Sequence, residues 1–549
     1  MTYIIKTISL VFVVLVLGGC GGGGGNTADS PTNVDTAVTE GTTTAEVENT
    51  NDETNTEDPV VSVPNTPLDD ELRQLIADEN LSGDASANRT LPAITDPKAQ
   101  LGKQLFFAKN LGGQQDAACV SCHHPVLGGG DELSLSVGVD AVNANSLVDA
   151  ELLGLGRFHT AAGGAPVVPR NAPTIFNAGL WDNGMFWDSR VQSTNPVAAA
   201  NGSGGGIITP DSVNFATADT SLPNGATLPA AQAGFPVTSA EEMRASFVPT
   251  ATNQSLRTAL ASRLNSEALW RQAFSAAFGD ATISFDRIAE AIGEYERSMV
   301  FVNSPWKAYV EGDNTALTDQ QKEGAILFLT PVNGPGNGGP GNGGAGCSRC
   351  HQGDFFSDEE HHIVAFPQIG LGKGNDSGNG ATADFGRENI SGQAADRFHF
   401  RTPSLLNIAV TAPYGHAGAY ATLAQVVAHY NNPRNEVDDL FGAAGGVPFV
   451  QNPDLCSLPQ IASLVQAGSV ACDDLYPNAY QDSVDAVNRL NDNGVTSSLL
   501  PTPNINGGER ASIVAFLEAL TDPCVTDRAC LDPWIIDGDD VGTFPDTLP

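Results

Sequence analysis

The chain carries one five-residue motif twice, once in each half. The first copy is Cys119-Val120-Ser121-Cys122-His123, and the second is Cys347-Ser348-Arg349-Cys350-His351. The two thiols of such a motif add across the vinyl groups of a haem, and the adjacent histidine becomes the proximal ligand of the iron. The alternatives are a redox dithiol or a zinc site, but zinc bound by both cysteine pairs would leave both histidines unexplained. The sequence therefore predicts two covalently bound haem c groups.

The chain has nine cysteines, and four of them belong to these motifs. Cys20 stands alone near the N-terminus, and an even number remains at Cys456, Cys472, Cys524 and Cys530. Disulfides persist in exported proteins, so these four are expected to pair. Their close spacing favours 456–472 and 524–530, although four cysteines allow three pairings.

The first twenty residues have the pattern of an export signal. An apolar run from Ile8 to Leu17 is too short to span a bilayer. It ends in Leu17-Gly18-Gly19-Cys20, which resembles a bacterial lipoprotein box with a lipidated cysteine; plain secretion is the alternative. We expect a protein of the cell envelope, on the periplasmic side or at the outer membrane, that touches the membrane only through a lipid anchor at Cys20.

Residues 21–67 contain five consecutive glycines and no Lys or Arg. Such a segment buries too little apolar surface to offset its ordering entropy, so we expect a flexible acidic linker. The whole chain has 26 Lys and Arg against 64 Asp and Glu, a net charge of −38. This charge repels phosphate backbones and excludes nucleic acid as a partner, while it favours partners that are basic.

Apolar periodicity predicts helices over 101–107, 283–299, 320–329, 423–430 and 512–520. The clearest has apolar residues at Ile288, Ile292, Tyr295 and Met299, which is helical spacing. No strand pattern is convincing. The expected fold class is mainly α, with long loops and one haem in each half.

Further motifs resemble, in the same order, those of the bacterial di-haem cytochrome c peroxidase superfamily, which includes the MauG-type enzymes. The residues that carry the resemblance, besides the two cysteine motifs, are Leu105–Phe107, Leu127–Gly129, Arg170–Thr174, Phe186–Arg190, Asn303–Pro305, Phe400–Leu405 and Thr411–His416. The resemblance implies two cytochrome-c-like haem domains after the signal peptide (1–20) and the linker (21–67). These are an N-terminal peroxidatic domain (68–315) and a C-terminal electron-transfer domain (316–549).

The resemblance also implies the reaction. It is the reduction of hydrogen peroxide to water, with electrons from a small c-type cytochrome or cupredoxin that enter at the C-terminal haem. One alternative is a MauG-like enzyme that oxidises residues of a partner protein. A second alternative is a plain electron-transfer cytochrome.

The family's residues around the first haem can be matched in this sequence. Its proton-shuttling glutamate precedes a methionine, which points to Glu242 in Glu241-Glu242-Met243, with Glu241 one residue away as the alternative. Trp187 matches the family's tryptophan between the haems, and an indole there can relay an electron.

The family's distal histidine is absent, since Ser136-Val137-Gly138 is followed by Val139. The resemblance then implies either an open distal position, as in MauG-type members, or His159 as a substitute. A calcium ion between the domains would be bound by the Asn171 side chain and the backbone carbonyls of Thr411 and Pro413, since oxygen ligands suit a hard cation.

The sixth ligand of the second haem is a methionine in the family's peroxidases, fourteen residues after the histidine that matches His416. Here that position is Tyr430, and the chain has four methionines, none beyond Met299. MauG-type members have a tyrosine at this position, and a phenolate would lower the ferric/ferrous potential. The alternative is that Tyr430 only packs, with His429 or no residue as the ligand. His124, His361 and His362 match no family role and are expected at the solvent-exposed surface.

Overall fold

In each half of the chain, a helix precedes the cysteine motif and packs against a second helix. The computed structural model describes residues 65–142, 153–159, 166–249, 251–332, 343–373, 382–467, 471–492 and 505–536. The predicted signal peptide and nearly all of the predicted linker lie outside these ranges. Among the described residues, no helix combines the length and apolar character needed to cross a membrane.

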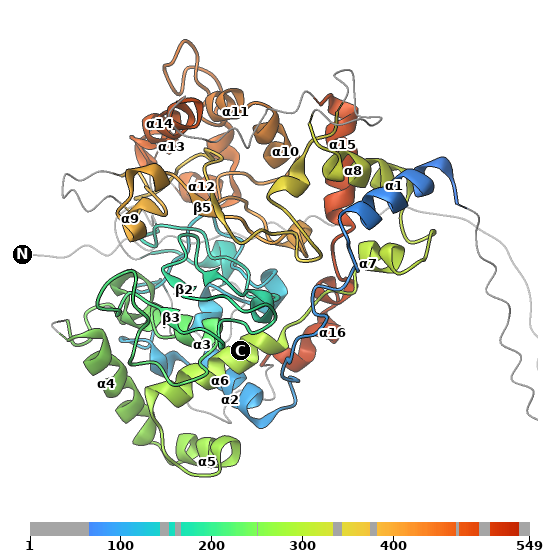
Figure 1. Cartoon of the computed structure of the whole chain (residues 1–549). Coiled ribbons are helices and arrows are strands. Elements are labelled where there is room, and N and C mark those ends of the chain that lie inside the picture. The colour runs from blue at the N-terminus through green and yellow to red at the C-terminus, as the bar shows by residue number, and fades with distance from the viewer. Residues whose placement is uncertain are drawn as a thin grey trace, which may run out of the picture. The chain divides into compact units, whose positions relative to one another are not determined.

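The described part of the chain is mainly helical, and its strands are short (Figure 1). The helices are α1 (Pro67–Asp78), α2 (Pro97–Phe107), α3 (Leu228–Gln232), α4 (Asn253–Asn265), α5 (Ala268–Phe278), α6 (Phe285–Ser298), α7 (Pro305–Val310), α8 (Asp319–Leu329), α9 (Glu388–Ser391), α10 (Leu423–Asn431), α11 (Pro433–Leu440), α12 (Pro459–Gln466), α13 (Cys472–Leu475), α14 (Ala479–Asn491), α15 (Gly507–Glu518) and α16 (Arg528–Leu531). The strands are β1 (Gly184–Met185), β2 (Val191–Ser193), β3 (Ile207–Ile208), β4 (His361–His362) and β5 (Phe400–Arg401).

The five predicted helices correspond to α2, α6, α8, α10 and α15, so these predictions are confirmed. The last begins at Gly507, earlier than predicted, because Asn506 caps it and forms a capping box with Glu509. Strands β1, β2 and β3 form one antiparallel sheet, and β4 pairs antiparallel with β5. These strands have two or three residues each, too few for a period-two pattern to be visible in the sequence.

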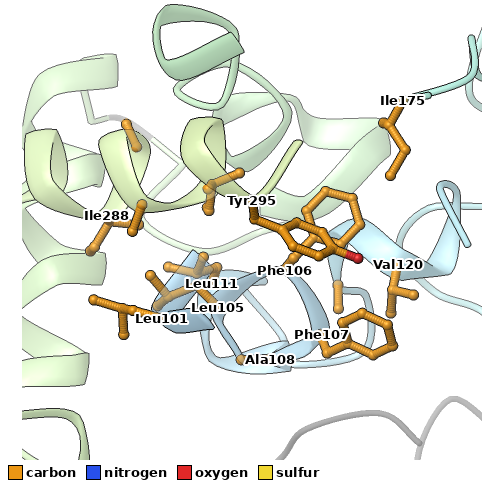
Figure 2. Packing of buried hydrophobic residues seen from close by; sticks show 14 of the residues in the cluster. Leu101, Leu105, Phe106, Phe107, Ala108, Leu111, Val120, Ile175, Ile288 and Tyr295 are labelled. Carbon is orange, nitrogen blue, oxygen red and sulfur yellow. The ribbon is translucent and has the colours of Figure 1, made fainter. Parts of the chain in front are cut away.

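In the first half, α2 packs directly against α6 (Figure 1). Gly102 makes this approach possible, because a Cβ there would lie 1.9 Å from the carbonyl oxygen of Ala291. The contact buries Phe106 against Tyr295, with ring centroids 5.1 Å apart (Figure 2). The first cysteine motif follows as a 3-10 turn at Cys119–Ser121.

The second half repeats this arrangement with α8 and α15. Here a Cβ on Gly324 would lie 1.9 Å from the carbonyl oxygen of Ser512. The second cysteine motif likewise opens as a 3-10 turn, at Cys347–Arg349. Each motif is therefore positioned by a helix crossing that requires a glycine.

A second repeated element is a loop in each half that hydrogen-bonds to the same backbone carbonyl. Pro173-Thr174-Ile175-Phe176-Asn177 and Pro403-Ser404-Leu405-Leu406-Asn407 have the same spacing of proline, hydroxyl residue and asparagine. Both asparagines have positive φ, 60° and 63°. Both also donate a side-chain N–H to the carbonyl of Phe301, at 3.1 Å from Asn177 and 2.9 Å from Asn407. The two halves thus present equivalent loops.

The structure contains two disulfides, Cys456–Cys472 and Cys524–Cys530. The pairing favoured by sequence spacing is therefore confirmed.

Candidate haem-binding active site

One cavity is lined by the cysteines and the histidine of both motifs. Most of the residues that line this cavity are apolar, and a smaller number are polar or charged. Its polar and charged lining includes Arg170, Asn171, Trp187, Arg190, Glu242, Glu296, His362, Lys373, Arg401, His416 and Tyr430. The donor set fits two covalently attached haems, since each motif offers two thiols and an imidazole to the same space.

The histidines of both cysteine motifs are held in the tautomer that an iron ligand needs. The Nδ1 of His123 is 3.3 Å from the carbonyl oxygen of Gly129, and the Nδ1 of His351 is 3.0 Å from that of Phe356. A carbonyl can only accept, so Nδ1 carries the proton and Nε2 has a lone pair for a metal. Burial lowers the pKa of both imidazoles, which keeps them neutral.

Burial also raises the pKa of the thiols of Cys122 and Cys347 to about 12. Cys119 shifts in the same direction for the same reason. These thiols are held protonated in an apolar wall.

Glu242 and Glu241 lie in different environments although they are neighbours. Both belong to a short π-helical turn, Ala240–Arg244, that Ser239 caps. Glu242 is half-buried and lines the cavity, whereas Glu241 is exposed and accepts a hydrogen bond from the Ser239 hydroxyl at 3.1 Å. The turn packs on Gly138, where a Cβ would lie 2.2 Å from the Glu241 carbonyl oxygen. Only Glu242 thus presents its side chain to the cavity.

Trp187 lines the cavity and is fixed by its indole N–H, which donates to the backbone carbonyl of Asn171 at 2.9 Å. The predicted calcium ligands Asn171, Thr411 and Pro413 line the same cavity. Their two segments are joined by a hydrogen bond from the Asn171 backbone N–H to the carbonyl of His416, at 2.9 Å.

Tyr430, on α10, lines the cavity, and its neighbour His429 does not. Burial raises the pKa of the Tyr430 phenol above its usual range, and the thiols of Cys350 and Cys347 act in the same direction. His429 has both ring nitrogens engaged, Nδ1 with the Tyr420 hydroxyl and Nε2 with the Val364 carbonyl, each at 2.8 Å. Of these two candidates, Tyr430 is the one that faces the cavity.

His159 pairs in a β-bridge with Ala141 and does not line the cavity. Val139, which replaces the expected distal histidine, is buried, and its backbone N–H donates to the carbonyl of Glu241 at 3.2 Å.

The prediction that three further histidines are solvent-exposed was wrong for His124, and His361 and His362 are only partly exposed. His124 is 7 % exposed, and its Nδ1 accepts a hydrogen bond from the Val126 backbone N–H. His361 bonds the Ser189 hydroxyl through Nε2 at 2.9 Å. His362 lines the cavity and bonds Asp358 at 2.7 Å.

Sequence reasoning also missed the charged wall of the cavity. The Arg170 guanidinium bonds Asp384 and Asp188, and all three side chains are buried. Burial raises the pKa of Glu296, another lining residue, to about 8. The motifs that contain Arg170 and Arg401 were recognised, but their basic residues were given no role.

Comparison with known proteins agrees with this site. Residues 96–315 match the family model of the di-haem cytochrome c peroxidases. Cytochrome c551 peroxidase of Pseudomonas aeruginosa is 28 % identical over 371 residues, which cover 66 % of this chain and 82 % of that protein. The methylamine utilization protein MauG of Methylophilus methylotrophus is 25 % identical over 340 residues, covering 62 % and 73 %.

A solved structure has the same fold. The crystal structure of a MauG-like protein associated with microbial copper homeostasis aligns with a TM-score of 0.50 and 21 % identity, over 82 % of this chain and 98 % of that one. Fold and site define a c-type cytochrome with two haem-attachment motifs on one cavity. The chain is similar to the di-haem cytochrome c peroxidases and to MauG, and it is an oxidoreductase of the cytochrome c peroxidase type.

Proposed function

We propose that this protein reduces hydrogen peroxide to water with electrons from a small c-type cytochrome or cupredoxin. The observation that supports this most is that both cysteine motifs, Glu242 and Trp187 line one cavity. The haems, when bound, supply the peroxide-reducing iron and the store of electrons. His123 and His351 would hold the irons, and Tyr430 would be a further ligand at the second.

The chain's own groups have distinct tasks in this proposal. The Glu242 carboxylate would move a proton between the peroxide oxygens, because it is the carboxylate of its turn that faces the cavity. The Trp187 indole, fixed by Asn171, would relay electrons between the two haem sites. Asn171, Thr411 and Pro413 would bind calcium and so join the two segments they belong to.

The test is steady-state turnover of hydrogen peroxide by the two-haem protein with a reduced small c-type cytochrome or a reduced cupredoxin. We expect peroxide-dependent oxidation of the donor. A two-haem protein that oxidises neither donor would overturn the peroxidase assignment.

A second candidate function is MauG-like oxidation of residues in a partner protein. Tyr430 favours it, because a tyrosine faces the cavity where the family's peroxidases have a methionine. The test is mass spectrometry of a candidate partner after incubation with the enzyme and peroxide. Modified tyrosine or tryptophan residues in the partner support this candidate, and an unmodified partner with active donor turnover excludes it.

We also propose that the protein is a lipoprotein of the cell envelope anchored through Cys20. Mass spectrometry of the native N-terminus tests this, since a lipidated Cys20 is the expected N-terminal residue. A mature N-terminus without lipid indicates plain secretion.

A further inference from the structure

We propose that Arg401 binds a propionate group of the haem attached at Cys347 and Cys350. The inference rests on the proposed presence of two haems and adds a binding residue for the second one. It comes from a difference between the two equivalent halves of the molecule.

Arg401 and Arg170 have similar but not identical places in the two halves. Arg401 lies two residues before Pro403 and Arg170 lies three residues before Pro173, the prolines that open the repeated proline, hydroxyl residue and asparagine. Each proline also contributes a backbone contact to the proximal histidine of its own half, Pro403 to His351 and Pro173 to His123. Each arginine therefore belongs to the loop that contacts the motif histidine of its own half.

The two arginines differ in how their charge is compensated. Arg170 has two carboxylate partners, Asp384 at 2.6 Å and Asp188 at 2.6 Å. Arg401 is 5 % exposed, and within the described residues it has no carboxylate at ion-pair distance. The acidic neighbour that attracts it most, Glu359, has its carboxylate bonded to the backbone N–H groups of Asp182 and Asn183.

The remaining contacts of Arg401 leave one end of the guanidinium without a partner. Nε donates to the carbonyl of Phe186 at 3.1 Å, and the guanidinium lies over the Trp181 ring at 3.4 Å. Nη1 is buried and has no hydrogen-bond partner in the described part of the protein. Burial lowers the pKa of Arg401 to about 10, so the group is cationic at neutral pH.

Burying a cation without a counter-ion costs free energy. A buried cation is therefore expected to have an anion beside it in the assembled protein. Arg401 lines the cavity. Its strand also pairs with the segment that follows the second cysteine motif, since Arg401 lies opposite His361 and the Thr402 backbone N–H donates to the Glu360 carbonyl at 2.9 Å. The anions that a haem brings into this cavity are its propionates, and a guanidinium is the side chain best suited to a carboxylate. The cation therefore has its counter-ion once the haem is attached.

The test uses the two-haem protein and three variants. Arg401→Gln removes the charge, Arg401→Lys keeps the charge but loses the forked donors, and Arg257→Gln is the control. Arg257 is buried like Arg401, but it is ion-paired with Asp211 and does not line the cavity. The readouts are haem content, the reduction potential of the second haem and the propionate bending bands in resonance Raman spectra.

We expect Arg401→Gln to shift the propionate bands of the second haem and to make its potential more negative, since a cation beside the propionates stabilises the reduced state. Arg401→Lys should recover the potential but not the band positions, and Arg257→Gln should change neither. Unchanged bands and potential in a two-haem Arg401→Gln protein would overturn the inference. If that variant does not assemble, unshifted bands in Arg401→Lys would overturn it. Loss of a haem from the wild-type protein would instead count against the proposed function.

Discussion

At the scale of single residues, a one-position difference decides which carboxylate can act in the cavity. Adjacent side chains on a helical turn point in different directions, so Glu242 lines the cavity, while Glu241 is exposed and accepts a hydrogen bond from the Ser239 hydroxyl. The family pattern alone left this choice open. The direction of each side chain depends on the π-helical geometry of Ala240–Arg244, which no sequence periodicity reveals.

If Glu242 moves the proton, Glu242→Gln will slow the reaction with peroxide by about 10²–10⁴-fold, the usual range for loss of a general acid or base. Haem content and the absorption spectrum should stay unchanged. Stopped-flow mixing with peroxide measures the rate. Glu241→Gln is the matched control and should react at the wild-type rate; the reverse pattern would assign the role to Glu241.

A second prediction concerns Tyr430. If its phenolate is the sixth ligand of the second haem, Tyr430→Phe will abolish the low-spin His/Tyr signal of the ferric protein in EPR spectra. Tyr430→Met will raise the potential of that haem, because a thioether favours the ferrous state. Tyr420→Phe is the control, since Tyr420 bonds His429 and does not line the cavity. An unaltered spectrum in Tyr430→Phe would place the ligand elsewhere.

At the scale of elements, two helix crossings position the two cysteine motifs. Both depend on a glycine whose Cβ would overlap a backbone oxygen of the facing helix. A backbone atom cannot rotate away as a side-chain end can, so the helices would have to separate. The sequence predicted the helices from their apolar periodicity but not these crossings, because a glycine in a helix has no pattern that marks it as a contact.

We therefore expect Gly102→Ala and Gly324→Ala each to lower the free energy of unfolding by about 1–3 kcal/mol or more, as overpacking of a filled contact does. Denaturant unfolding of the holoprotein measures this. Gly507→Ala in α15 is the control, because its Cβ would contact only the end of the Arg510 side chain, at 3.9 Å. Equal stability of all three variants would show that the crossings tolerate a methyl group.

The contact of α1 with α8 predicts a pH effect on stability. Burial raises the pKa of Asp69, but hydrogen bonds from Lys322, Thr66 and Tyr309 outweigh it and hold that pKa well below its usual range. A folded-state pKa below the unfolded value of about 3.9 stabilises the protein above that pH. The stabilisation is lost as the pH falls towards the folded-state pKa.

Asp69→Asn should accordingly destabilise the protein at pH 7 by about 3 kcal/mol, since it leaves the Lys322 ammonium without its buried counter-ion. The difference from the wild type should shrink as the pH falls below about 4. Thermal unfolding over a pH series measures it. Asp280→Asn, in an exposed pair with Arg287, is the control and should have little effect. A difference that does not depend on pH would contradict the assignment.

At the scale of the whole molecule, two halves with matching loops enclose one cavity. The haem type and the candidate residues Glu242, Trp187 and Tyr430 could be predicted from the sequence, because each lies in or near a motif that keeps its spacing, and these three side chains line the cavity. The burial of His124 and the partial burial of His361 and His362 could not be predicted, since their hydrogen-bond partners lie on turns and on other elements. The unpaired charge of Arg401 was equally hidden, because it depends on carboxylates distant in the sequence.

The proposed function depends most directly on a covalent haem at each of the two cysteine motifs in this cavity. The pyridine haemochrome assay on the purified full-length protein, combined with quantitative amino-acid analysis, counts c-type haems per chain directly. We predict two haems per chain, with the absorption band of a haem attached through two thioether bonds. One haem or none per chain would contradict it.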